Sequence, residues 1–146
     1  MIGIVLVSHT PSLAQATAEF IAACAPDVPV ALAGGNRSGG FGASYGKVVE
    51  ALRSFDLVGG DSAERAPLPD APVPSRTVDG VILIPDLGSS ALTSRMVLAD
   101  RPDPRCVVVD CPFVEGAFEA AVQAQAGTCL PEIVESLRSV RSLRKL

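Results

Sequence analysis

Four short apolar runs, each followed by a segment with helical periodicity, constrain the fold of this chain more than any other feature. The first run, "IGIVLVS", reads as a strand that is buried on both faces. Strands are predicted over residues 2–8, 28–34, 79–86 and 106–110, and helices over 11–25, 43–55, 87–100, 111–127 and 130–146. This alternation predicts an α/β fold, with an open, mainly parallel four-stranded sheet and helices on both faces.

The predicted topology also indicates which edge of the sheet carries the candidate functional residues. Right-handed crossovers between parallel strands place every strand-to-helix turn at the carboxyl edge of the sheet. Ligands and chemistry concentrate at that edge in open α/β sheets. The four turns expected there are residues 8–10, 34–42, 85–90 and 110–113.

Composition and charge exclude several classes of protein. The chain has 146 residues, 48% of them hydrophobic, which is enough for a packed core. Its net charge of −4 argues against nucleic acid as the main partner. The opening run is too short for membrane insertion and lacks the basic start and cleavage site of a signal peptide. A cytoplasmic location is therefore predicted.

Cysteine spacing gives no sign of a metal site. No two of the four cysteines form a CxxC pair, and a single histidine is too few for the usual zinc sites. We expect reduced thiols and no metal or other cofactor. The four positions are Cys24, Cys106, Cys111 and Cys129.

Residues 59–76, "GGDSAERAPLPDAPVPSR", are rich in Pro, Ala, Gly and Asp and show no periodicity. They are predicted to form a surface loop or linker. A domain boundary here would leave neither half with enough elements for its own core. The preferred interpretation is one domain over residues 1–146 with an insertion at about 59–76.

His9, the only histidine, follows the first strand directly. Thr10 can cap the next helix, with Pro11 at its first position. No GxSxG motif supports a Ser-His-Asp triad, although "DLGSS" resembles one superficially. A lone histidine can itself be a nucleophile, and a phosphohistidine needs a neutral ring, an acceptor for its other N–H and donors around the phosphoryl oxygens. Asp86 either orients this imidazole or caps a helix.

The glycine-rich loop "GNRSGGFG", residues 35–42, does not fit a nucleotide-binding motif. A P-loop requires a glycine where Phe41 stands and a Ser or Thr where Val48 stands. The dinucleotide fingerprint fails because Tyr45 occupies its last glycine position. A flexible loop that allows close approach of a partner is the preferred interpretation.

Several segments resemble a known family, the phosphotransfer subunit of the phosphoenolpyruvate-dependent dihydroxyacetone kinase. That subunit is related to the IIA component of the mannose-type sugar phosphotransferase system. The resemblance covers about residues 1–127, with a gap at 59–76. It is carried by "IVLVSHTPSLAQATAEF", "GKVVEAL", "VILIPDLGSSALTSRMVL" and "CPFVEGAFEAAVQAQAG", and most specifically by V-S-H, D-x-G-S and P-x-V-E-G-A.

The resemblance implies a mannose IIA-like fold, usually dimeric, and a concrete site. The family's phosphorylated histidine falls on His9 and its neighbouring aspartate on Asp86. His9 Nε2 is expected to attack while Asp86 holds the other nitrogen and helix-start amides bind the phosphoryl oxygens. Support around the phosphoryl group is predicted from Ser8, Thr10, Gly88 and Ser89, and partner contacts from Gly42 and Glu115.

The partners follow from the same resemblance. The donor would be the small histidine phosphocarrier protein, and the acceptor would be the ADP-binding subunit of dihydroxyacetone kinase. Because the chain ends at residue 146, the donor is expected to be a separate protein. No nucleotide or metal is expected in this subunit.

Three departures from the family and two alternatives accompany this prediction. The family often has Gly-Thr-Asp where this chain has Gly42-Ala43-Ser44, so a hydroxyl is lost or supplied by Ser44. The insertion is long, but it precedes the third strand and should lie at the edge opposite His9. The third departure is the end at residue 146.

The alternatives are the IIA component of a mannose-type sugar transporter and a non-catalytic docking regulator with the same fold.

Overall fold

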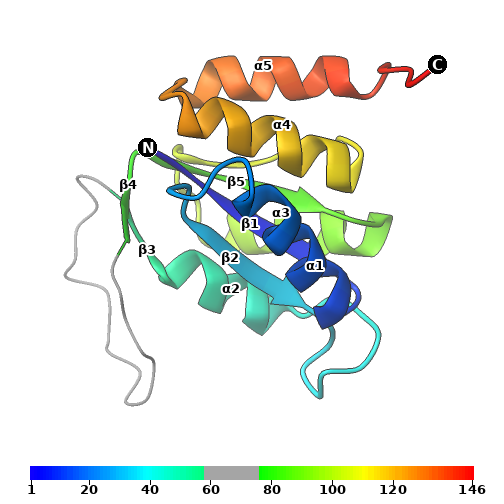
Figure 1. The fold of residues 1–146 in the computed structure, drawn as a ribbon. Coiled ribbons are helices and arrows are strands. Elements are labelled where there is room, and N and C mark those ends of the chain that lie inside the picture. Colours follow the sequence, from blue (N-terminus) through cyan, green and yellow to red (C-terminus); the bar gives the residue numbers. More distant parts are fainter. Residues whose placement is uncertain (58–75) are drawn as a thin grey trace.

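The computed structural model describes residues 1–57 and 76–146. Its main sheet has four strands, all pairs of neighbours are parallel, and the order is β2-β1-β5-β6. The fold predicted from the sequence is thereby confirmed (Figure 1). The strands are β1 (Ile2–Ser8), β2 (Val30–Gly34), β5 (Gly80–Pro85) and β6 (Cys106–Val108).

In the described part of the chain, five helices cover the two faces of this sheet. Helices α1, α4 and α5 pack on one face, and α2 and α3 pack on the other. Figure 1 shows α4 and α5 stacked on one side of the strands and α2 on the opposite side. Their bounds are α1 (Pro11–Ala22), α2 (Tyr45–Arg53), α3 (Gly88–Asp100), α4 (Phe113–Gln125) and α5 (Leu130–Val140).

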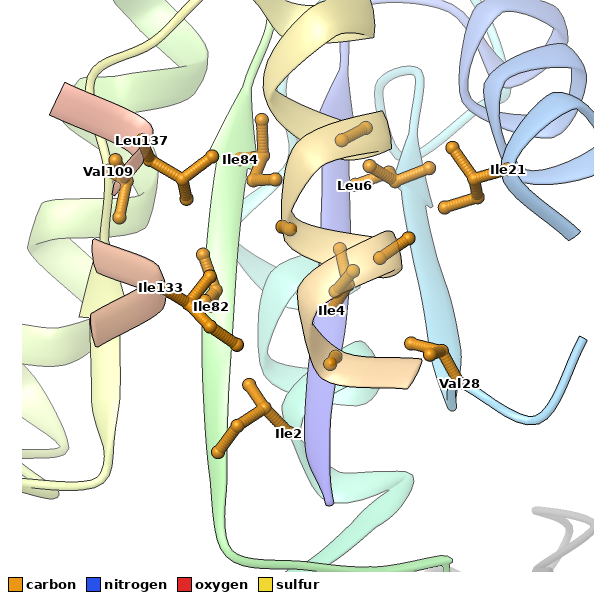
Figure 2. Close-up of a cluster of buried hydrophobic side chains, with 14 of the residues drawn as sticks. Ile2, Ile4, Leu6, Ile21, Val28, Ile82, Ile84, Val109, Ile133 and Leu137 are labelled. Carbon is orange, nitrogen blue, oxygen red and sulfur yellow. The ribbon is translucent and has the colours of Figure 1, made fainter. Parts of the chain in front are cut away.

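Alternation along β1 explains why helices cover both faces. Ile2, Ile4 and Leu6 point into the core shared with α1, α4 and α5 (Figure 2). Val5 and Val7 point into the second core, under α2 and α3. All five side chains are at most 3% exposed. Since burying such a side chain stabilises the fold by about 1.5–3 kcal/mol, this strand fixes both helical layers.

The register of the strands decides which turns meet. Ser8 pairs with Gly34, and Val7 pairs with Pro85. Residues 9, 35 and 86 therefore follow the ends of three neighbouring strands at the carboxyl edge, with residue 86 level with Ser8. The sequence places His9 and Asp86 at strand ends, and the parallel register brings those two ends side by side.

The predicted helix over residues 43–55 is wrong at its carboxyl end. α2 ends at Arg53, and Phe55 belongs to a short strand, β3 (Phe55–Leu57), which pairs in parallel with β4 (Arg76–Val78). Phe55 is 1% exposed and packs closely on the backbone at Gly3, where an added Cβ would lie 2.7 Å from its ring. This tertiary contact outweighs the helical spacing of Phe55 with Leu52.

The predicted insertion at 59–76 lies outside the described residues, except for Arg76, the first residue of β4. After β4, the Asp79 amide donates to the Met1 carbonyl at 3.0 Å, and Gly80 pairs with Ile2. The chain therefore enters β5 at the amino edge of the sheet, away from His9. Within residues 1–57 and 76–146, every helix is too short or too polar to cross a bilayer.

Gly34→Ala is expected to destabilise the fold, and Gly88→Ala is its matched control. A Cβ at Gly34 would lie 2.7 Å from the backbone Cα of Pro11, while a Cβ at Gly88 would meet nothing within 4 Å. Overpacking against fixed backbone costs about 1–3 kcal/mol. Gly88→Ala is expected to be neutral or to stabilise by about 0.4–1 kcal/mol. Urea unfolding measures both; equal midpoints for the two variants would contradict the close approach of β2 and α1.

Candidate functional site

His9 lies at the junction of β1 and α1, where the extended chain turns into a helix. Thr10 is the N-cap of α1, and its hydroxyl accepts from the Leu13 amide at 3.3 Å. Pro11 starts the helix with a fixed φ and no N–H to satisfy. The turn leaves His9 only 6% exposed, which is unusual for an ionisable side chain. Its imidazole is therefore held by the protein on most sides.

The Asp86 carboxylate is the main polar partner of this imidazole. His9 Nδ1 lies 2.8 Å from Asp86 Oδ1, and both side chains are 7% exposed. The Asp86 amide donates to the Val7 carbonyl at 3.0 Å, so the β1–β5 pairing itself fixes the carboxylate beside His9. N-capping does not account for Asp86, because the N-cap of α3 is Leu87 and has no side-chain hydrogen bond.

Five donors converge on the two carboxylate oxygens. Oδ2 accepts from the Ser8 hydroxyl and the His9 amide, both at 2.9 Å. Oδ1 accepts from the Ser90 hydroxyl and the Leu87 amide, both at 2.7 Å, in addition to His9 Nδ1. Burial alone raises the pKa of Asp86, but the donors from His9, Ser90 and Ser8 outweigh it and lower the pKa from 3.8 to about 2. Asp86 is therefore an anion at neutral pH.

The anionic carboxylate determines which nitrogen of His9 carries the proton. A carboxylate without a proton can only accept, so Nδ1 must donate its hydrogen to Asp86. In the neutral ring, the lone pair then lies on Nε2, which contacts the Ser89 hydroxyl. Ser90 Oγ lies 3.0 Å from Nδ1, but its hydrogen points to Asp86 Oδ1. The site thus presents one nucleophilic nitrogen, Nε2, beside a hydroxyl donor.

The glycine-rich loop closes over the same turn. The Gly35 amide donates to the Ser8 carbonyl and the Gly42 amide to the His9 carbonyl, each at 2.9 Å. Gly42 has a φ of +141°, a conformation that side-chain-bearing residues rarely adopt. Next to it, the Phe41 ring lies against the His9 imidazole, with centroids 5.0 Å apart and planes tilted by 40°. The loop therefore contacts both the backbone and the side chain of His9.

The structure brings His9, Asp86, Ser8 and Ser89 into one hydrogen-bonded cluster. Thr10 joins it only through its amide, which donates to Ser8 Oγ at 3.2 Å, because its hydroxyl caps α1. Gly88 is exposed at the first position of α3. Glu115, on α4, pairs with Lys145 at 2.6 Å instead, and this pairing lowers the pKa of Glu115.

Two residues of the site are missing from the sequence-based prediction. Ser90 is fully buried and donates to Asp86, and Phe41 covers the imidazole. The spacing of four residues between Asp86 and Ser90 is a usable signal, because it places the hydroxyl one helical turn beyond the carboxylate. Phe41 offers no such signal, since its contact with His9 depends on the path of an irregular loop.

The metal-ligating side chains of the described residues are spread apart. Within residues 1–57 and 76–146, no three His, Cys, Asp or Glu side chains gather closely enough to hold an ion. The four cysteines are free thiols. Burial raises the pKa of Cys111 to about 11, so its thiol is protonated at neutral pH.

Comparisons with known proteins show which families this chain resembles. Residues 3–60 match the family model described as the PTS system fructose IIA component. The chain is 25% identical over 138 residues to the phosphotransferase subunit DhaM of the PTS-dependent dihydroxyacetone kinase of Lactococcus lactis subsp. lactis. It is 26% identical over 138 residues to the phosphoryl donor subunit DhaM of PEP-dependent dihydroxyacetone kinase 1 of Listeria innocua. Both alignments cover 94% of this chain and 94% of the relative.

A solved structure supports the fold alone. The crystal structure of EF1359, a protein of unknown function, is 22% identical to this chain and superposes with a TM-score of 0.72, covering 94% of this chain and 93% of the other. The resemblance drawn from the sequence is confirmed: this chain is similar, over nearly its whole length, to the phosphotransferase subunits of dihydroxyacetone kinases, and its amino-terminal part matches the IIA family.

Proposed function

We propose that this chain is a phosphohistidine carrier in which His9 Nε2 accepts a phosphoryl group and then passes it on. One observation carries the proposal: His9 Nδ1 lies 2.8 Å from Asp86 Oδ1 at the carboxyl edge of the sheet. Because a carboxylate can only accept, this contact places the ring proton on Nδ1 and leaves the lone pair on Nε2. A neutral, oriented imidazole with a fixed tautomer is the form that nucleophilic phosphoryl transfer requires.

The transfer step balances without a metal or nucleotide in this chain. The Nε2 lone pair attacks the phosphorus of the donor's phosphohistidine, the new Nε2–P bond forms, and the donor's N–P bond breaks. The donor imidazole leaves with that electron pair. The Nδ1 proton stays on His9, so the product ring is cationic and Asp86 stabilises it as an adjacent anion.

Groups around Nε2 support binding of the phosphoryl oxygens. The Ser89 hydroxyl contacts Nε2 before transfer and can turn its hydrogen toward a phosphoryl oxygen afterwards. Gly88 and Ser89 open the 13-residue helix α3, whose positive dipole end favours an anion. Ser8 and Thr10 act in support, because Ser8 donates to Asp86 and Thr10 caps α1.

The relatives suggest the partners. Their names describe phosphoryl-donor and phosphotransferase subunits of dihydroxyacetone kinases. The proposed donor is the histidine phosphocarrier protein, and the proposed acceptor is the ADP-binding kinase subunit. This chain is then one subunit of an enzyme system: it carries the phosphoryl group, while the acceptor subunit phosphorylates dihydroxyacetone. The proposal also includes contact of Gly42 and Glu115 with these partners, a single domain, a homodimer and a cytoplasmic location.

A IIA component of a sugar transporter is the second candidate, because the family model matched by residues 3–60 is described as a fructose IIA component. The same match also supports the kinase-subunit function. Its chemistry at His9 is the same, but the phosphoryl group goes to a sugar-specific IIB protein. A docking regulator with the same fold would carry no phosphoryl group at all. The three functions therefore differ in what happens to a label on His9.

We expect the ADP-binding kinase subunit together with dihydroxyacetone to remove labelled phosphate from this protein. The Nε2–P bond would break as a terminal oxygen of ADP attacks the phosphorus, and the label would then appear in a triose phosphate. The measurement is label retained on the protein over time, with a control lacking the kinase subunit. Loss of label to a IIB protein and its sugar instead would select the transporter function.

A further inference from the structure

Phe41 is an exposed aromatic residue whose ring contacts the proposed nucleophile. Its side chain is 71% exposed, yet its ring centroid lies 5.0 Å from that of His9. The phenyl ring thus contacts the imidazole at a tilt of 40° while most of its surface remains open. The proposed function so far assigns it no role.

The loop around Phe41 is held in place by its own hydrogen bonds. Asn36 Oδ1 accepts from the Ser38 amide at 3.0 Å and the Gly40 amide at 2.9 Å, and its Nδ2 donates to the Phe41 carbonyl at 3.3 Å. The Gly42 amide, in the same peptide group as the Phe41 carbonyl, donates to the His9 carbonyl, and the Asn36 amide donates to the Gly40 carbonyl at 2.8 Å on the other side of Phe41. Both peptide groups flanking Phe41 are therefore fixed, one of them to His9 itself.

Phosphoryl transfer removes one of the bonds that orient His9. At rest, Asp86 holds Nδ1 and the Ser89 hydroxyl contacts Nε2. The Ser89 hydroxyl binds the same lone pair that must attack phosphorus, so this bond is lost as the reaction proceeds. Asp86 then holds the buried ring at Nδ1, and the orientation of Nε2 depends on the groups packed around the imidazole. The Phe41 ring is one of these groups, with its centroid 5.0 Å from that of His9.

From this geometry we propose that Phe41 is a positioning residue, which keeps the His9 imidazole aligned for attack once Ser89 has released Nε2. The inference rests on the proposed function in taking His9 as the phosphoryl acceptor. It predicts an effect on the chemistry with any donor, large or small. A role limited to docking of a partner protein predicts an effect with protein donors only.

Phosphoramidate, a small phosphoryl donor, separates these two roles. In that reaction the Nε2–P bond forms, the P–N bond of phosphoramidate breaks, and ammonia leaves. Phe41→Ala is expected to slow phosphorylation by phosphoramidate about tenfold, since small misplacements of a reacting group cost up to about 100-fold. Phe41→Tyr keeps the ring and is expected to restore the rate. Phe118→Ala, at an aromatic side chain on α4 that is 37% exposed and pairs with Phe20, is the matched control.

The lone histidine supplies a spectroscopic readout of the same contact. His9 gives the only imidazole resonances of the protein, and a phenyl ring at 5.0 Å shifts them. The shift is expected to disappear in Phe41→Ala and to persist in Phe41→Tyr and Phe118→Ala. Wild-type rates with phosphoramidate in Phe41→Ala would overturn the proposal, even if transfer from the protein donor were slow. The phosphoramidate reaction needs no protein donor. Failure of the proposed carrier function would therefore be seen separately, as absence of transfer from the protein donor to the wild type.

Discussion

His9→Ala is expected to abolish covalent phosphorylation of this protein. The chain has no other histidine, so no second imidazole can replace Nε2 as the acceptor. After incubation with phosphoenolpyruvate and the general phosphotransfer proteins, the wild type should gain ~80 Da, the mass of one phosphoryl group, and the variant should gain nothing. Intact-mass spectrometry at neutral pH measures the difference, which should be complete rather than partial.

The His9→Ala variant should still fold. Asp86 loses only one of its five donors and keeps Ser8, Ser90 and the amides of His9 and Leu87. A lost hydrogen bond to a charged group costs about 1.5–3 kcal/mol, which leaves a typical domain folded. Ser94→Ala, at a buried hydroxyl one turn beyond Ser90 that donates only within α3, is a suitable control. Phosphate found on the His9→Ala protein would refute the assigned acceptor.

Asp86→Asn has the second-largest expected effect, a loss of transfer rate on the order of 10²–10³-fold, as for removal of one preorganised electrostatic partner. The amide carries no charge, so the cationic ring formed on phosphorylation loses its stabilising partner. The side-chain NH₂ of Asn would replace one of the two carboxylate oxygens, and in either orientation it would face a backbone N–H donor. This donor is the His9 amide at the Oδ2 position and the Leu87 amide at the Oδ1 position. Single-turnover phosphorylation measures the rate. Asp79→Asn, at the amino end of the same strand, is the control and should react like the wild type.

The same variant changes how stability depends on pH. The pKa of Asp86 is lowered from 3.8 to about 2 in the folded protein. The stabilisation this provides is fully present above pH 3.8 and is lost as the pH falls through about 2. As the pH is lowered from 3.8 to about 2, the free energy of unfolding of Asp86→Asn should fall less than that of the wild type. Identical pH profiles of the urea midpoint for the two proteins would show that the donors around Asp86 do not hold it as an anion.

The sequence was sufficient to place the two central residues of the site. His9 and Asp86 each follow a continuous apolar run, and such runs are typical of strands in a parallel sheet, because helices cover both faces of those strands. β1 and β5 are indeed the inner pair, with every residue from Ile2 to Ser8 buried. The ends of two adjacent parallel strands lie side by side at one edge of the sheet, so the meeting of His9 and Asp86 does not depend on the path of the loops.

The sequence analysis did not predict the elements that form only by pairing with residues far away in the sequence. β3 and β4 are three residues each, too short for a periodic signal, and they exist because they pair with each other and bury Phe55 against Gly3. Their register joins residues 55–57 to 76–78, which are separated by more than 18 positions in the sequence. No local pattern in either segment reports that pairing.

Hydrophobic periodicity is a local property of the chain, and it was enough to predict the α/β order of elements, the burial of the inner strands on both faces, and a histidine and an aspartate at one sheet edge. Three features of the site became known from the folded chain alone: which nitrogen of His9 is free, the bond from Ser90 to Asp86, and the contact of Phe41 with the imidazole. Those features depend on distances between side chains from separate segments, and such distances exist only after the strands have paired and the loops have closed.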